Sequence, residues 1–153
     1  MNREYILNLS KREIDALLAE HLYNYKHGKT PKDYDGLNGG DDILIPPNRD
    51  NDYFIYPPRG KVSYTFHVPQ YSENLDSAYE VLLDLEPRLC SANQIGIRWM
   101  ITKDEDAVSV RINKWHKNDE VPHWSECWVT GNEYKLAEMI CQCVLMTVLK
   151  ISK

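Results

Sequence analysis

The sequence contains no run of eighteen consecutive apolar residues, which excludes a membrane-spanning helix of ordinary length. Its 18 Lys and Arg are outnumbered by 23 Asp and Glu, so the net charge of -5 supplies no excess cations for a phosphate backbone. We therefore expect no membrane and no nucleic acid among the partners. Residues 1–5 lack the start of a secretion signal, and the four cysteines lack the spacing of a disulfide framework, which favours a reducing cytoplasm.

Motifs that carry catalysis or hold cofactors are also missing. The sequence has no GxSxG, Walker or HExxH segment, so we assign no catalytic residue and expect no cofactor. Cys141 and Cys143 are two apart in a helical pattern and point to different faces, which predicts buried thiols rather than a metal site. The acidic segment 33–42 lacks the register of a calcium loop. These absences favour a binding protein over an enzyme.

The sequence does contain amphipathic segments with helix-starting signals. Apolar side chains recur at helical spacing in three places, each preceded by a residue that favours an N-cap. The segments and their predicted N-caps are 10–23 with Ser10, 72–86 with Ser72, and 133–151 with Asn132. Ser10 and Glu13 form a predicted capping box, Pro87 is expected to end the second helix, and a short helical turn is expected over residues 3–9.

Alternation of apolar and polar residues predicts the strands. Residues 95–101 and 108–112 alternate on either side of the acidic turn 104–106, which predicts a hairpin with one apolar face. Further strands are expected over 53–56, 62–66 and 123–130. Residues 26–62 hold five of the eight prolines and five of the seven glycines, which indicates a long loop.

This order of segments predicts one domain over residues 1–153 of the α+β class. We expect an antiparallel or mixed sheet of about four strands, sandwiched with three α-helices. The closing helix carries more apolar residues than a single stripe requires. The excess predicts either a homo-oligomer interface or a central place for this helix in the monomer.

Three of these segments resemble the phage ABA sandwich domain family of small phage and prophage proteins. They are residues 2–7 with 12–20, residues 69–81, and residues 137–145. The resemblance spans most of the chain but departs in the segment 26–62, which is longer than the usual connection in that family. It implies an α/β sandwich expressed in the cytoplasm of a bacterial host, and it supplies no catalytic residues.

Two arginines of the predicted hairpin form the first candidate site. Arg98 and Arg111 project from its polar face and lie directly opposite or diagonal to one another, depending on the length of the turn. Like charges so placed repel, unless an anion binds between them through paired hydrogen bonds to the guanidinium groups. Alternatively, each arginine pairs with an Asp or Glu of a covering helix or extends into water.

An aromatic segment next to the hairpin forms the second candidate site. Residues 115–128 contain three of the four tryptophans and two of the five histidines. Trp115 and Trp124 are predicted to stack on a base or another aromatic ring while His116 or His123 bonds its edge, although packing within the fold is an open alternative for each. For Trp128 we predict core packing.

These features lead to two hypotheses of function. In the first, the chain is a non-enzymatic phage accessory protein, acting against host defence, that sequesters a small anionic nucleotide-like molecule. The ligand would lie between Arg98, Arg111 and residues 115–124, covered by the segment 26–62. In the alternative, the chain is a protein-binding inhibitor or assembly factor that engages a host or phage protein. Its acidic surface would then act together with Tyr34, Tyr53 and Tyr56.

Overall fold

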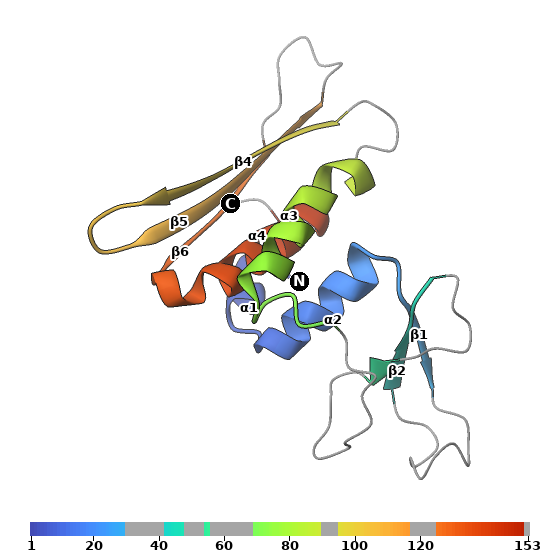
Figure 1. Ribbon diagram of the computed structural model, residues 1–153. Coiled ribbons are helices and arrows are strands. Elements are labelled where there is room, and N and C mark those ends of the chain that lie inside the picture. The colour runs from blue at the N-terminus through green and yellow to red at the C-terminus, as the bar shows by residue number, and fades with distance from the viewer. Residues whose placement is uncertain (30–41, 48–53, 56–68, 90–94, 117–124, 152–153) are drawn as a thin grey trace.

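The computed structural model describes residues 1–29, 42–47, 54–55, 69–89, 95–116 and 125–151 (Figure 1). The helices are α1 (Arg3–Leu7), α2 (Lys11–His21), α3 (Leu75–Leu89) and α4 (Leu136–Val148), and a 3₁₀ turn spans Glu133–Lys135. The strands are β1 (Lys26–Lys29), β2 (Asp42–Ile45), β3 (Phe54–Ile55), β4 (Ile95–Lys103), β5 (Val108–His116) and β6 (Ser125–Gly131). The fold is therefore α+β.

The strands form two antiparallel sheets of three strands each, in the orders β1-β2-β3 and β4-β5-β6. The expected single sheet of about four strands is thus not what the chain forms. Helix α4 packs against β5 and β6 of the larger sheet and against α2 and α3, and α2 contacts β2 of the smaller sheet (Figure 1). The helices consequently lie between the two sheets.

Helix α4 is buried on all sides. Every residue from Met139 to Thr147 is buried, because the sheet, α1, α2 and α3 all contact this helix. The central position of α4 in the monomer explains why its apolar residues are not confined to one side of the helix. Cys141 and Cys143 are both buried, as predicted, and burial raises the pKa of their thiols.

Helix α2 begins as the sequence predicts. The Ser10 backbone N–H donates to the Glu13 carboxylate at 2.8 Å, and the Glu13 N–H donates to the Ser10 hydroxyl at 3.4 Å, which completes the capping box. The hydrogen bonds from Ser10 also lower the pKa of the Glu13 carboxyl. The short helix predicted before it is α1.

Helix α3 differs from the prediction at both ends. Its first backbone groups are capped by Asn74, whose side-chain oxygen accepts from the Asp76 N–H at 2.9 Å. Ser72, the predicted cap, instead donates its N–H to the Asp15 carboxylate at 2.7 Å. Pro87 does not end the helix but lies in its last turn, where the missing N–H removes a single hydrogen bond, and α3 continues to Leu89.

The segment predicted as a long loop contains the smaller sheet. β1 and β2 pair with His27 opposite Leu44, and β3 joins β2 with Ile55 opposite Ile43. Ile43 and Leu44 are both buried, although as neighbours in β2 they point to opposite faces of this sheet. β3 falls within the strand predicted over 53–56, whereas the strand predicted over 62–66 lies outside the described residues.

The hairpin of β4 and β5 has the predicted apolar face. Ile101 lies opposite Val110 and Trp99 opposite Ile112, which is the register of a four-residue turn. β6 continues this face with Cys127, which is buried. The predicted strand over 123–130 is β6, apart from residues 123 and 124, which lie outside the described ranges. No helix within those ranges is long and apolar enough to cross a membrane.

Candidate binding face on the larger sheet

The side of the larger sheet that is turned away from α4 carries polar and aromatic side chains, and we call it the outer face. Side chains alternate between the two sides of a strand. Val110, Ile112 and Cys127 are buried on the side toward α4, so their neighbours in sequence lie on the outer face. The outer-face residues are Gly96, Arg98, Met100 and Thr102 of β4, Ser109, Arg111, Asn113 and Trp115 of β5, and Glu126, Trp128 and Thr130 of β6. Arg98, Met100 and Arg111 are exposed to solvent.

The two candidate arginines lie diagonally on this face. The register places Asn113 directly opposite Arg98, with Arg111 two residues further along β5. Arg111 Nε lies 3.1 Å from Glu126 Oε1, and both side chains are partly exposed. An acidic residue of the neighbouring strand therefore balances Arg111, rather than the covering helix that we expected as the alternative. Anion binding by the two arginines stays a prediction.

Trp115 of β5 lies on the same face of the sheet as Arg98 of β4. It pairs with Gly96, and a Cβ added to Gly96 would meet ring atoms of Trp115 at 2.2 Å, so the indole lies directly over this glycine. Arg98 follows Gly96 by two residues and projects from the same face. The glycine within an otherwise alternating strand was a sequence signal for this close approach, and sequence reasoning missed it.

Trp128 is not in the core, contrary to the prediction. It is half-buried on the outer side of β6, because the neighbouring residues Cys127 and Val129 occupy the side that faces α4. The Arg3 guanidinium carbon lies 4.5 Å from the Trp128 ring centroid, which is cation–π geometry. Arg3 is far away in sequence, and no local pattern identifies this contact.

The structure thus brings Arg98, Arg111 and Trp115 together on one face. The other two predicted ligand-binding residues, His123 and Trp124, lie outside the described residues. The same holds for the tyrosines of the alternative site, Tyr34, Tyr53 and Tyr56.

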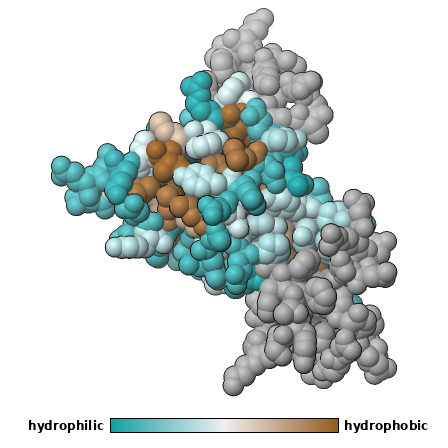
Figure 2. Space-filling model, in the orientation of Figure 1, coloured by the Kyte–Doolittle hydropathy of each residue, from teal (hydrophilic) through white to brown (hydrophobic). Residues whose placement is uncertain are grey.

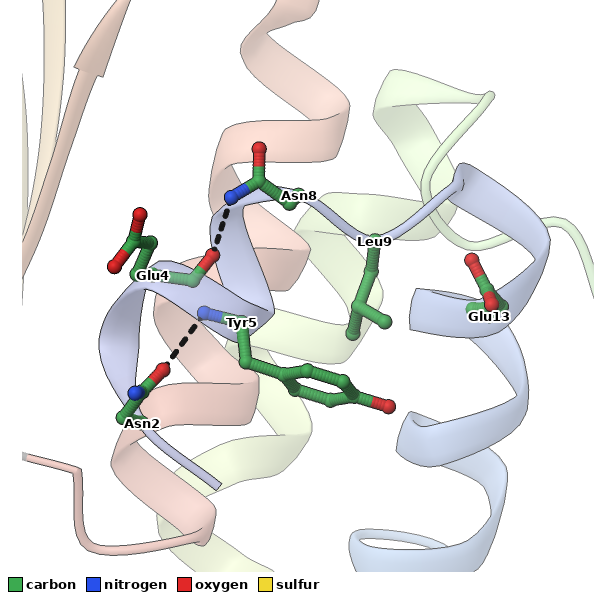
Figure 3. A pocket seen from close by; sticks show the side chains of 6 residues that line it. All are labelled: Asn2, Glu4, Tyr5, Asn8, Leu9 and Glu13. Atoms are coloured by element: carbon green, nitrogen blue, oxygen red, sulfur yellow. Dashed lines mark hydrogen bonds between the residues drawn. The ribbon is translucent and has the colours of Figure 1, made fainter.

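An open hollow of about 460 Å³ lies elsewhere, between α1 and the start of α2 (Figure 3). Its polar groups serve the helix ends. Asn2 accepts from the Tyr5 N–H at 2.8 Å, Asn8 donates to the Glu4 carbonyl at 2.9 Å, and Glu13 belongs to the capping box. The charged residues that line the hollow are both glutamates, so it does not suit an anionic ligand.

Among the described residues, no group of three or more His, Cys, Asp or Glu side chains could hold a metal ion. Comparison of the chain with protein-family models, with curated proteins and with solved structures found no match.

Proposed function

We propose that this chain is a phage accessory protein of the ABA sandwich type, which binds and sequesters a small anionic molecule with a planar base. One observation carries the proposal. Arg98, which is exposed, lies on the same face of the sheet as Trp115, two residues along β4 from the glycine that the Trp115 indole covers. The setting would be the cytoplasm of a bacterial host, where binding alone removes the molecule from its receptor.

Each group of this pair has a role in recognition. The planar guanidinium of Arg98 offers paired donors to a phosphate or carboxylate. An aromatic ring held by the sheet stacks on a base, which typically stabilises binding by about 1–3 kcal/mol per base. Asn113, directly opposite Arg98, adds an amide donor and acceptor at the same level of the sheet.

Arg111 is the second cation of the proposed site. It pairs with Glu126, whose carboxylate would compete with an anionic ligand for the guanidinium. Because this ion pair is partly exposed, an incoming anion can replace the carboxylate at small cost. Glu126→Gln removes the competing charge and should tighten anion binding by about twofold to fivefold, which corresponds to a partly exposed ion pair. Weaker binding by this variant would contradict the assignment of Arg111.

Direct titration tests the proposal. Isothermal calorimetry on the full chain would use a nucleoside monophosphate, a cyclic dinucleotide and inorganic phosphate as probes. We expect a nucleotide to bind more tightly than phosphate, and Arg98→Ala to lose this binding. Lys103→Ala is the matched control, because it removes a cation of the same strand whose ammonium pairs with Glu133 at 2.6 Å.

Equal losses in the Arg98 and Lys103 variants would indicate a general charge effect and overturn the proposed site. Absence of binding by all three probes would remove nucleotides as the ligand class.

A second function, as a protein-binding inhibitor or assembly factor, is favoured by the side chains exposed on β4. Met100 is 47% exposed on the outer face, and methionine is enriched in protein interfaces. Under this function, a host or phage protein would copurify with the chain, and the double variant Arg98→Ala, Arg111→Ala would retain most of its inhibitory effect. Under the first function, the double variant would lose ligand capture.

A further inference from the structure

β4 is an edge strand with backbone groups available for pairing. It is first in the order β4-β5-β6, and within the described part of the chain it pairs with β5 alone. The Asp104 N–H donates to the Ala107 carbonyl at 2.9 Å, so these two residues form a hydrogen-bonded pair next to the turn. This pair determines which of the following residue pairs between β4 and β5 are hydrogen-bonded. Because bonded and non-bonded pairs alternate in an antiparallel ladder, Ile97, Trp99 and Ile101 direct their N–H and C=O groups to the free edge.

Beside this edge, α3 presents an apolar flank. Leu75, Tyr79 and Leu83 follow one another at intervals of four residues, and Leu83 is 63% exposed. Hydrophobic side chains gather over α3 and the neighbouring part of the larger sheet (Figure 2). Trp99, which is 40% exposed, belongs to the side of β4 that faces the helices.

The opposite flank of α3 is turned toward α2, which orients the helix. Asp84 accepts a hydrogen bond from the Tyr23 hydroxyl at 3.2 Å, just after α2, and Arg88 lies 4.3 Å from the centroid of the same ring. Since α3 contacts both α4 and β4, the apolar flank faces the edge of the sheet. One apolar surface therefore follows both the strand and the helix at this edge.

We infer that a second copy of this chain covers this surface, with the two β4 strands paired antiparallel about a twofold axis at Trp99. Trp99 is the central residue of the nine in β4, so this is the twofold register that pairs the whole strand. Ile97 lies opposite the partner's Ile101, and Arg98 lies opposite the partner's Met100. No like charges face each other across the pair.

Charge and shape both fit this arrangement. The register places the partner's Lys103, whose ammonium pairs with Glu133 at 2.6 Å, opposite Ile95, so no charge of the same sign faces it. Glu86 continues the stripe of Leu75, Tyr79 and Leu83 toward the C-terminal end of α3. The partner's apolar residues at 97, 99 and 101 extend the inner side of the sheet over the exposed flank of α3.

The dimer also extends the outer face. The two sheets join into one of six strands, and the partner's Met100 lies directly beside Arg98. This inference stands on the edge strand and α3 alone, so it does not depend on the proposed ligand.

Sedimentation equilibrium on the full chain tests the pairing with two variants of equal charge. Trp99→Glu places two carboxylates at the twofold axis and should raise the dimer dissociation constant by at least about tenfold. Met100→Glu adds the same charge to a neighbouring side chain of similar exposure, but places it beside the partner's Arg98. It should leave the dimer intact, and circular dichroism would confirm that both variants fold.

A cysteine mixture provides a second measurement in case Trp99→Glu unfolds. Mild oxidation of Arg98→Cys mixed with Met100→Cys should join the two chains between these positions, whereas Arg98→Cys alone should not link through position 98. A monomeric wild-type chain at every soluble concentration would overturn the inference. So would a dimer that neither charge variant affects, or a mixture that forms no link between positions 98 and 100.

Discussion

Asp15 is a buried carboxylic acid, and its replacement by asparagine gives a sharp test of the packing between α2 and the segment that precedes α3. The side chain is fully buried on α2 and accepts hydrogen bonds from the Ser72 N–H at 2.7 Å and from Arg12 Nη1 at 2.9 Å. Asp15→Asn keeps an oxygen acceptor for Ser72 but cannot ionise. The two proteins should therefore differ in how their stability depends on pH.

The magnitude follows from the pKa of the Asp15 carboxyl. Burial raises it from its ordinary value of 3.8 to about 6, against the opposing effects of the bonds from Ser72 and the charge of Arg12. The folded state thus holds this proton more tightly than the unfolded state. The corresponding stability is present below pH 4 and is lost as the pH rises through 6, and with about 1.36 kcal/mol per pKa unit it amounts to about 3 kcal/mol.

Urea denaturation of both proteins between pH 4 and pH 7 measures this effect. The free energy of unfolding of the wild type, minus that of Asp15→Asn, should fall by about 2–2.5 kcal/mol across the range, because the unfolded carboxyl is already partly ionised at pH 4. The subtraction cancels the contribution to the pH dependence from titratable groups that are not coupled to Asp15. Arg12 and Glu73, which act on it electrostatically, remain in both proteins. A difference that rises with pH would show that the ion pair with Arg12 outweighs burial, and a constant difference would refute the raised pKa.

Three further changes test other parts of the account. Gly96→Ala should displace the Trp115 indole, because the new Cβ would lie 2.2 Å from its ring, and urea denaturation should show a loss of about 1–3 kcal/mol. Ser10→Ala removes one half of the capping box and should cost about 1 kcal/mol in the same measurement. Arg3→Ala removes the cation over Trp128 and should change tryptophan fluorescence while lowering stability by about 0.5–1 kcal/mol.

Local signals predicted the elements that local interactions determine. The capping box of α2 needs only Ser10 and Glu13, and the hairpin of β4 and β5 follows from alternation across a short turn. Ser72 was wrongly predicted as a helix cap because its partner Asp15 lies 57 residues earlier in the chain. A capping preference describes only which local hydrogen bonds a residue can make. A residue distant in sequence can bind the same residue and change its role.

Only β3 of the smaller sheet was predicted, and β1 and β2 escaped prediction for a related reason. Its strands have four, four and two residues, too few for a clear period, and glycine and proline dominate the surrounding sequence. Pairing between residues well separated in the chain holds β1 to β2 and β2 to β3. Such non-local pairs leave little trace in any one segment.

For the candidate site, alternation on β4 and β5 predicted that Arg98 and Arg111 share a face, and the structure bears this out. The partner of Arg111 was not predictable, because Glu126 comes from β6, whose register depends on more than the hairpin. Trp128 was misassigned because alternation fixes which residues share a side but does not say which side is buried. Cys127 and Val129, small enough to pack against α4, occupy the buried side instead.

The central claim is that the outer face captures a small anionic molecule. It is tested most directly by incubating the purified chain with extract of phage-infected bacteria, repurifying and denaturing it, and identifying released molecules by mass spectrometry. The account predicts a released nucleotide from the wild type and none from the double variant Arg98→Ala, Arg111→Ala. Equal release from both proteins, or no small molecule from the wild type, would contradict it.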